Sequence, residues 1–443
     1  MVHVVVQASK YLMMFLFLIY TFECFFVFHY KEGKGQKRIY RNQRSLMFII
    51  HLDGFVLLYL TTSNYQVIGL YLMQVVILAA LYVVYHKMYQ YASELVLNNM
   101  CMLICIGMLI QTRLNFSKGF RQYIFLLAGA LCAMLIPVIL NHVSVFRKLT
   151  WVYAVVGIGA IGFVAIKGAV SYGAKLSIEL FGFSFQPSEF VKILFVFYIA
   201  GMLREAWDLK QLFLTSCVSA VFVLILVVSN DLGGALLYFF TYLVMIYVAS
   251  GHLSYFVAGS GFIALIGVLG NKLVSHVHNR VVAWIDPLSV YETQGNQVSN
   301  SLFAIGTGGW FGLGLGQGLP SKIPVVSNDF VFAAISEEMG GIFAFCLVMV
   351  CMSIFIMIFN VSMQMKDRFY KLVAVGLGSV YAMQVFLNIG GVIKFIPSTG
   401  VTLPLISYGG SSLLSTMLQF GIIQGLYIMH AHPNSKINRP EKS

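Results

Sequence analysis

The chain has 443 residues, of which 59% are hydrophobic and only 10% are charged, and its formal net charge is +12 at pH 7. Soluble domains carry roughly 25% charged residues, so this composition excludes an ordinary soluble protein and indicates one embedded in a membrane. The positive charge is not gathered in a basic module with base-stacking aromatic residues, and we expect no nucleic acid partner.

Apolar blocks long enough to cross a membrane follow one another along the chain. A membrane-spanning helix needs about 20 mostly apolar residues, because lipid offers its backbone no hydrogen-bond partners. Two blocks meet almost without a loop at Asn230 and could be one broken region, but each half alone is long enough to cross. We therefore expect an all-α polytopic membrane protein with thirteen spans. Their ranges are 4–28, 46–62, 66–85, 96–112, 122–140, 150–168, 187–203, 211–229, 231–250, 254–270, 331–358, 371–393 and 403–429.

Lys and Arg residues mark the cytoplasmic side of a membrane protein. Here they gather in four segments, namely 29–44, 203–210, 359–371 and the tail 431–443. Thirteen spans place all four segments on one side of the membrane. We therefore expect a cytoplasmic C-terminus, an N-terminus on the outer side, and a large extracytoplasmic loop near 271–330, which has few basic residues.

The loop near 271–330 is the expected place of function, because loops of this length in compact folds are usually functional or disordered. Its aromatic residues, among them Trp284 and Trp310, argue against disorder. Its glycine-rich runs at 306–309 and 312–318 indicate close packing or backbone contacts to a phosphate group. Packing is the more common role for any single glycine.

Five motifs occur in order between the fourth predicted span and the C-terminus. They are FSFQPSE at 183–189 with Lys192, DLG at 231–233, Arg280 and Val281 with Trp284 and Pro287, IPVVSNDFVFAAISEEMG at 323–340, and PSTGVTLPLISYGGSS at 397–412. Together they resemble the SEDS family (shape, elongation, division and sporulation), which includes FtsW, RodA and SpoVE. The resemblance covers about residues 96–430.

The resemblance implies a peptidoglycan glycosyltransferase with a ten-helix core in the bacterial cytoplasmic membrane. Such an enzyme polymerises lipid II into glycan strands and releases undecaprenyl pyrophosphate. Its implied partners are lipid II, the growing glycan strand, membrane lipids and a class B penicillin-binding protein, and its implied cofactor is a divalent cation, Mg²⁺ or Mn²⁺. No sequence cluster of His, Cys and carboxylate residues indicates a dedicated metal site. Elongation, division and sporulation stay open as its cellular process.

The family's aspartate corresponds to Asp329, which we expect to be the catalytic residue. Transfer to a sugar hydroxyl needs a base for the hydroxyl proton and positive charge for the departing pyrophosphate. Partial desolvation beside Phe330 would make Asp329 a better base. We expect Arg280 to contact the pyrophosphate, although a salt bridge to Asp286 or Glu292 is the structural alternative. The expected substrate-binding residues are Arg280, Lys175, Gln186, Glu189, Lys192, Glu338, Ser411 and Ser412.

Several other polar residues have a structural interpretation. Glu189 and Lys192 lie three residues apart and could simply pair, although ionisable groups inside a membrane are commonly functional. The remaining expectations are Asp231 as the cap of a helix beginning at Leu232, Glu337 or Glu338 as a hydrogen-bond partner of the active-site loop, Gln384 and Asn388 as ties between helices, and Lys10, Glu23 and Asp53 as partners of one another.

The first ninety residues have no counterpart in the ten-helix core. We expect an extra N-terminal transmembrane module at 1–90 that serves packing or partner docking and carries no catalytic residue. The SEDS-like core then spans 91–430, and 431–443 forms a cytoplasmic tail.

Two functions besides polymerisation stay open. A flippase for the lipid-linked precursor needs polar groups along the whole crossing, whereas a polymerase needs them at the outer face, where the loop near 271–330 concentrates them. A catalytically weak scaffold is the third interpretation, because the chain departs from the common family pattern. It has Leu176 and Ser177 where many members have Arg and Trp, and Val325 and Ser327 where many have Glu and His.

Overall fold

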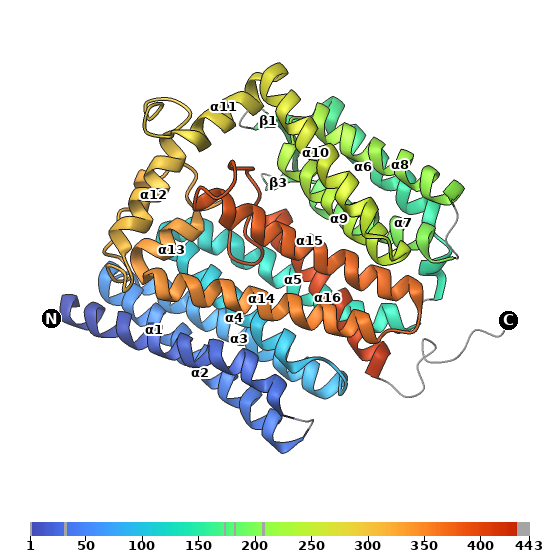
Figure 1. Ribbon diagram of the computed structural model, residues 1–443. Helices are drawn as coiled ribbons and strands as arrows, with labels where there is room; N and C mark the ends of the chain where they lie inside the picture. The colour runs from blue at the N-terminus through green and yellow to red at the C-terminus, as the bar shows by residue number, and fades with distance from the viewer. Residues whose placement is uncertain are drawn as a thin grey trace.

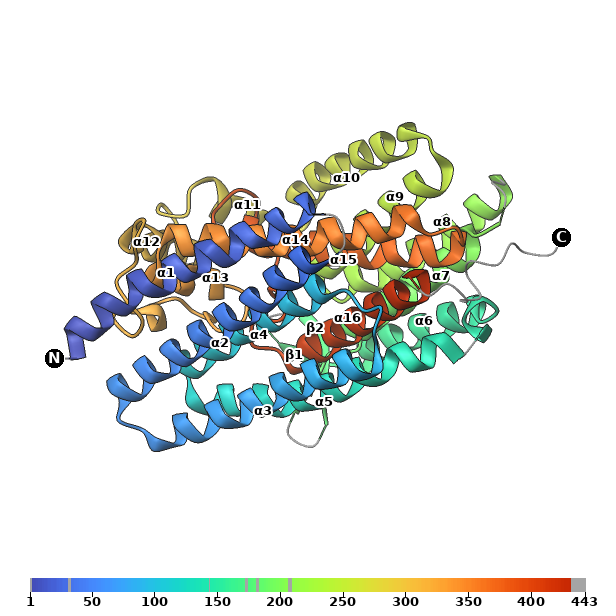
Figure 2. The same cartoon turned by 90° about the horizontal axis from the view of Figure 1, so that it is seen from below.

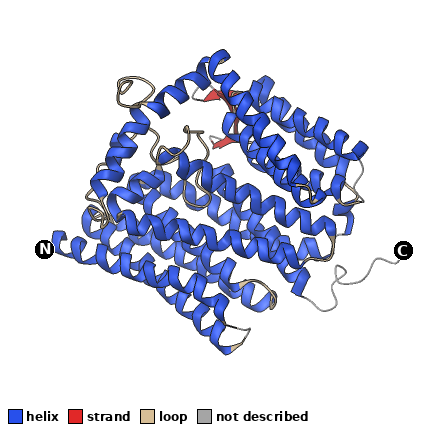
Figure 3. Cartoon of the chain, viewed as in Figure 1, coloured by secondary structure: helices blue, strands red, loops and turns tan. Residues whose placement is uncertain are grey.

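A computed structural model describes residues 2–30, 33–142, 144–171, 174–180, 183–205 and 209–431. These residues form a bundle of long helices that lie alongside one another (Figure 1). Strands occur only in one small sheet of the described chain (Figure 3). The all-α polytopic fold expected from the sequence is confirmed.

Twelve described helices are long and apolar enough to cross a membrane. They are α1 (Val2–Phe26), α2 (Lys34–Thr62), α3 (Tyr65–Met88), α4 (Glu94–Leu114), α5 (Phe116–His142), α6 (Thr150–Lys167), α8 (Leu209–Val228), α9 (Leu232–Ser250), α10 (Leu253–Leu273), α14 (Gly341–Gln364), α15 (Arg368–Val392) and α16 (Gly410–Ala431). The thirteenth expected span is α7 (Ser188–Leu203), which packs against α6, α9 and α15. Its 16 residues rise only about 24 Å, which is less than the roughly 30 Å thickness of a hydrocarbon core.

The predicted span 331–358 is wrong as a single helix. It is divided into α13 (Val331–Met339) and α14 by Gly340, whose φ of +90° favours glycine. A Cβ at Gly340 would lie 2.4 Å from the backbone nitrogen of Gly312, so the break lets the glycine-rich loop approach the helix directly. The last span also begins later than predicted, because 403–409 is not helical and forms turns and bends at 404–408 before α16.

About half of the predicted loop near 271–330 is helical. It contains α11 (Ser275–Ile285), α12 (Asn296–Gly308) and the 3₁₀ turn η3 (Pro320–Lys322), and α12 and α13 lie at the end of the bundle where α1 begins (Figure 1). Two further 3₁₀ turns are η1 (Val27–His29) and η2 (Ser144–Arg147). The expected basic loop at 29–44 is also mostly helical, because α2 already begins at Lys34.

A small antiparallel sheet between α6 and α7 was not foreseen from the sequence. Its strands are β1 (Ala169–Ser171), β2 (Ala174–Leu180) and β3 (Phe183–Phe185), in the order β1-β2-β3. Glu179 pairs with Ser184 in the β2–β3 register. The sheet therefore leads directly into α7, which carries Glu189 and Lys192, two of the expected site residues, near its start.

The three N-terminal helices lie along one side of the bundle, where α1 packs on α14, α2 on α4 and α3 on α5 (Figure 2). Tyr20 of α1 donates to Asn99 of α4 at 2.9 Å, and Asn99 donates to Ser353 of α14 at 3.2 Å.

The acidic and basic residues of the N-terminal helices do not bind one another, so that expectation is wrong. Glu23 accepts from Asn42, and Asp53 accepts from Ser9. Lys10 donates to the backbone of the glycine-rich loop.

Candidate functional site

Two motif segments that are distant in sequence lie side by side at one end of the bundle. The backbone N–H of Tyr408 donates to the carbonyl oxygen of Ser327 at 2.7 Å. Gln111 of α4 donates to the carbonyl oxygens of both Ser327 and Ile406, at 2.9 and 3.0 Å. Because Gln111 is fully buried, this bridge fixes the segment before Asp329 against the segment before α16.

Asp329 lies where the chain enters α13. The neighbouring Phe330 is 1% exposed and anchors this entry in the core. Asn388 of α15 donates to the carbonyl oxygen of Asp329 at 2.9 Å and to that of Val401 at 2.7 Å. Asn388 was expected to tie helices together, but it instead ties α15 to two non-helical segments, one of which carries Asp329.

Arg280 reaches the same place from α11. Its Nη1 donates to the carbonyl oxygen of Ser398 at 2.8 Å, and Trp284 one turn later donates to that of Lys394 at 3.1 Å. A Cβ placed on Gly400 would lie 3.9 Å from Arg280 Nη2 and 3.7 Å from Asp329 Oδ2. The guanidinium and the carboxylate therefore approach one another around a glycine.

The structural alternative for Arg280 is wrong. Neither Asp286 nor Glu292 forms an ion pair with Arg280 in the described chain, and both acids are exposed. Asp286 instead accepts from the backbone N–H of Ser289 at 3.3 Å. The two acids are therefore separate from the site around Gly400.

Burial changes the acidity of the site residues. It raises the pKa of Asp329 from 3.8 to about 7, although the nearby positive charge of Arg280 lowers that pKa in part. Burial also raises the pKa of Asp231 to about 6, while the N–H of Gly234 lowers it. That N–H donates to Asp231 at 2.8 Å, which confirms Asp231 as the cap of α9. Burial lowers the pKa of Arg280, and the charge of Asp329 raises it.

A second polar cluster joins α7, α15 and α16. Lys192 is 2% exposed and donates to Glu189 at 2.5 Å and to Gln384 at 3.0 Å. Gln384 donates to Thr402 at 3.4 Å, and the hydroxyls of Thr402 and Ser412 lie 2.7 Å apart. The predicted pairing of Glu189 with Lys192 is confirmed. The cluster reaches Thr402. The neighbouring Val401 is the residue whose carbonyl oxygen Asn388 binds together with that of Asp329.

The expected substrate-binding residues separate into three groups. Ser411 accepts from the backbone N–H of Gln186 at 2.9 Å, so these two residues join the cluster formed by Glu189, Lys192 and Ser412. Glu338 is 1% exposed and lies apart from both groups, against Arg113 and the glycine-rich loop. Lys175 lies in β2, and its side chain is outside the described residues, as are residues 432–443 of the expected tail.

Lys118 belongs to the site but was not among the expected site residues. Its Nζ donates to Ser327 Oγ at 2.8 Å and lies 5.4 Å from the centre of the Tyr408 ring. It therefore places a positive charge over the junction of the two motif segments. The only signal in the sequence is that Lys118 is a basic residue outside the four segments in which Lys and Arg gather.

Some buried polar atoms at this site have no partner within the described protein. They include Asn388 Oδ1 and Thr399 Oγ1, both close to the peptide segments around Asp329. Buried polar atoms are nearly always hydrogen-bonded. These two atoms are therefore available to a substrate or to water.

The described residues contain no group of three or more His, Cys, Asp or Glu side chains that could hold a metal ion. Mg²⁺, however, usually keeps several waters and binds to one or two carboxylates together with substrate phosphates. Asp329 beside the cationic Arg280 fits an ion shared with a bound pyrophosphate, and it does not fit a metal site made by protein alone.

Comparison with known proteins gives consistent matches. The family model described as "Cell cycle protein", for FtsW, RodA and SpoVE, matches residues 94–431. The peptidoglycan glycosyltransferase RodA of Mycobacterium bovis is 33% identical over 329 residues, which cover 68% of this chain and 69% of that protein. The stage V sporulation protein E of Bacillus subtilis is 35% identical over 268 residues, covering 58% and 72%.

Two solved structures share the fold. A chain in the structure described as "Structural coordination of polymerization and crosslinking by a peptidoglycan synthase complex" has a TM-score of 0.67 at 22% identity, covering 77% of this chain and 99% of that chain. The rod shape determining protein RodA of Thermus thermophilus has a TM-score of 0.59 at 22% identity, covering 77% and 98%. Fold and site define a multi-pass membrane protein with a half-buried acid and an arginine at one end of its bundle. The chain belongs to the FtsW, RodA and SpoVE family of cell cycle proteins.

Proposed function

We propose that this chain is a peptidoglycan glycosyltransferase that polymerises lipid II into glycan strands in the plasma membrane, in cell elongation, division or sporulation. Curated relatives at 32–35% identity are named peptidoglycan glycosyltransferase RodA or FtsW and stage V sporulation protein E. The observation that carries the proposal is the position of Asp329, a half-buried acid with a pKa near 7, beside Arg280.

In the proposed reaction Asp329 is the general base. Its carboxylate takes the proton of the acceptor sugar hydroxyl while the hydroxyl oxygen bonds to the anomeric carbon of the donor, and the bond from that carbon to the pyrophosphate breaks. A base works best when its pKa lies near the working pH, which a pKa of about 7 satisfies. Arg280 offers two parallel N–H donors that match the phosphate geometry.

A bound divalent cation would neutralise negative charge on the leaving pyrophosphate. Such an ion would be held mainly by the pyrophosphate oxygens and water beside Arg280, so that the carboxylate of Asp329 stays available as the base. The protein's own residues orient the groups: Asn388 fixes the Asp329 backbone, and Ser398 fixes Arg280 through its carbonyl oxygen.

The polar cluster around Lys192 supports the chain at Thr402, beside the proposed site. We propose that Gln186, Ser411 and Ser412 line the path of the lipid, with Lys175 nearby on β2. Glu189 and Lys192 bind each other and keep Thr402 in place through Gln384. We assign Glu338 to the glycine-rich loop, where both of its oxygens have neighbours in the protein.

The orientation proposed from the sequence is an outer N-terminus and a cytoplasmic C-terminus. Two arginines lie at the end of the bundle opposite Asp329, where Asp367 caps the start of α15. Arg147 pairs with Asp367 at 2.5 Å, and Arg204 donates to the carbonyl oxygen of Arg147 at 2.8 Å. The positive-inside rule supports a cytoplasmic position for this end, and with it an outer position for the proposed site.

We also propose a class B penicillin-binding protein as partner, which would crosslink the strands. One solved structure with this fold comes from a complex described as coordinating polymerisation and crosslinking. Growing glycan, lipid II and membrane lipids complete the expected partners.

The proposal is tested by incubating the purified full-length chain, in lipid nanodiscs, with lipid II and Mg²⁺ or Mn²⁺. Glycan strands on a gel are the expected product. A separate vesicle assay follows lipid II crossing a membrane. Transport across vesicles without any polymer would instead support the flippase. We consider the flippase the weaker proposal, because it needs polar groups along the whole crossing, whereas the charged groups of the site gather at one end of the bundle.

A further inference from the structure

The first helix contacts the glycine-rich loop at 309–318. Gln7 Nε2 donates to the carbonyl oxygen of Leu313 at 3.1 Å, and Lys10 Nζ donates to that of Gly312 at 3.0 Å. The two donors lie three residues apart, on one face of α1. Residues outside the region matched by the family model therefore bind a loop inside it.

That loop is bound in turn to the end of α13. The N–H groups of Leu313 and Gly314 donate to the carbonyl oxygens of Glu337 and Glu338, at 3.0 and 2.8 Å. The side chain of Glu338 accepts from the N–H of Gly316 at 3.1 Å. Arg113 of α4 pairs with the same carboxylate at 2.9 Å. The loop and α13 therefore form one connected unit.

Glycine is required where the three segments meet. Gly312 has a φ of +75°, and a Cβ there would lie 2.4 Å from the carbonyl oxygen of Glu338. Gly314 has a φ of +107°, and a Cβ there would lie 2.7 Å from a methyl group of Val6 on α1. Both positions leave no room for a side chain between α1, the loop and α13.

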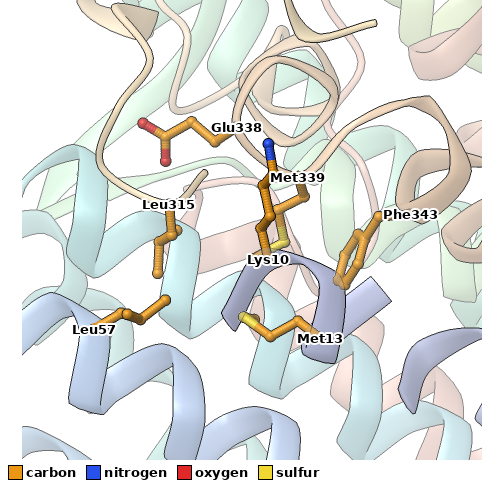
Figure 4. A pocket seen from close by; sticks show the side chains of 7 residues that line it. All are labelled: Lys10, Met13, Leu57, Leu315, Glu338, Met339 and Phe343. Carbon is orange, nitrogen blue, oxygen red and sulfur yellow. The ribbon is translucent and has the colours of Figure 1, made fainter. Parts of the chain in front are cut away.

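Lys10 and Glu338 also line one small cavity between α1 and α13 (Figure 4). It encloses about 10 Å³, which is room for roughly one water molecule. Its other walls are apolar side chains: Met13, Leu57, Leu315, Met339 and Phe343. Phe343 packs closely on Phe17 of α1, with ring centres 4.4 Å apart and ring planes tilted by 37°.

We propose that Lys10 is a positioning residue for the glycosyl transfer. This inference rests on the function proposed above. Lys10 fixes the loop through Gly312, the loop fixes α13 through Glu337 and Glu338, and α13 begins directly after Asp329 and Phe330. The N-terminal module thus acts on catalysis without touching substrate. A displacement of about 1 Å at a reacting group can cost about a hundredfold in rate.

The experiment compares the full-length chain with the variants Lys10→Met and Lys10→Arg. Ser9→Ala is the control for packing, because it removes a contact between α1 and α2 and leaves the loop bonds intact. Lys34→Met is the control for charge, at an exposed site in the first turn of α2. The measurements are kcat and KM for lipid II, and hydrogen exchange of the amides in 309–319.

We expect Lys10→Met to lower kcat about tenfold, to leave KM nearly unchanged, and to speed exchange at Leu313 and Gly314. Lys10→Arg should restore both, and the two controls should resemble wild type. Wild-type kcat in Lys10→Met overturns the positioning role, and so does an equal loss of kcat in Ser9→Ala. If the wild-type chain makes no polymer, the proposed function fails, while the exchange rates still show whether Lys10 fixes the loop.

Discussion

Arg280 Nη2 and Asp329 Oδ2 both lie close to Gly400, where a Cβ would be 3.9 Å from the first atom and 3.7 Å from the second. They come from different segments, α11 and the entry to α13. The arginine lowers the pKa of the acid in part, and burial raises it more, so that the pKa is about 7. This balance between burial and charge gives the first prediction.

The rate of polymerisation should follow the ionisation of Asp329. The ionised form is the base, so the rate should rise with pH until about 7 and then level off, with a tenfold loss per pH unit on the acid side. Arg280→Gln removes the charge that lowers this pKa and should move the midpoint upward. Arg280→Lys should keep the midpoint and raise KM, because an ammonium lacks the paired donors. An unchanged midpoint in Arg280→Gln would contradict the pairing.

Asn388→Leu should slow the reaction without abolishing the fold. It removes the two hydrogen bonds that join the carbonyl oxygens of Asp329 and Val401. We expect kcat to fall about 10- to 100-fold, with little change in KM. Gln419→Leu is the matched control, since Gln419 is an equally buried amide that binds the carbonyl oxygen of Leu377, away from the site. A similar kcat loss in the control would assign the effect to general destabilisation.

Lys192→Met should destabilise the protein, because it leaves Glu189 without its cation inside the bundle. Removing one partner of a buried ion pair typically costs about 3–5 kcal/mol. The double variant Lys192→Met with Glu189→Gln should recover much of this loss in a thermal unfolding measurement. If the single variant is as stable as wild type, the pair does not have the structural role given to it here.

Labelling of single cysteines from outside intact cells tests the orientation. Gln36→Cys lies near the start of α2, at the basic end, and Ser321→Cys lies in η3, near the proposed site. In a background with the exposed Cys217 changed to Ser, a membrane-impermeant reagent should label position 321 and spare position 36. The reverse pattern would invert the topology.

The long helices could be predicted from the sequence, because apolar length and the absence of charge determine them directly. The break at Gly340 could not, since 331–358 is mostly apolar, with only Ser336, Glu337, Glu338 and Ser353 as polar residues. The break depends on the approach of Gly312 from a distant loop. Helices α11 and α12 were missed because they are short and polar enough to resemble a loop.

The site residues that lie in a motif could be predicted from the sequence. Those that only tertiary contacts connect to the site could not. The resemblance singled out Asp329, Arg280 and the pair of Glu189 and Lys192. It gave no sign that Lys10, some 300 residues away in sequence, binds Gly312. Such a contact follows from how α1 packs on α14, which a single sequence does not reveal.

The most direct test of the account is the change Asp329→Asn, which keeps the shape of the side chain and removes its basicity. Asp286→Asn is the matched control, because Asp286 is an exposed acid between α11 and α12 that lies apart from Arg280. Polymerisation of lipid II by the purified full-length variants is the measurement. The account predicts a loss of about 10²–10⁴ in rate for Asp329→Asn, with normal expression and thermal stability, and wild-type activity for Asp286→Asn. Near wild-type polymerisation by Asp329→Asn would contradict it.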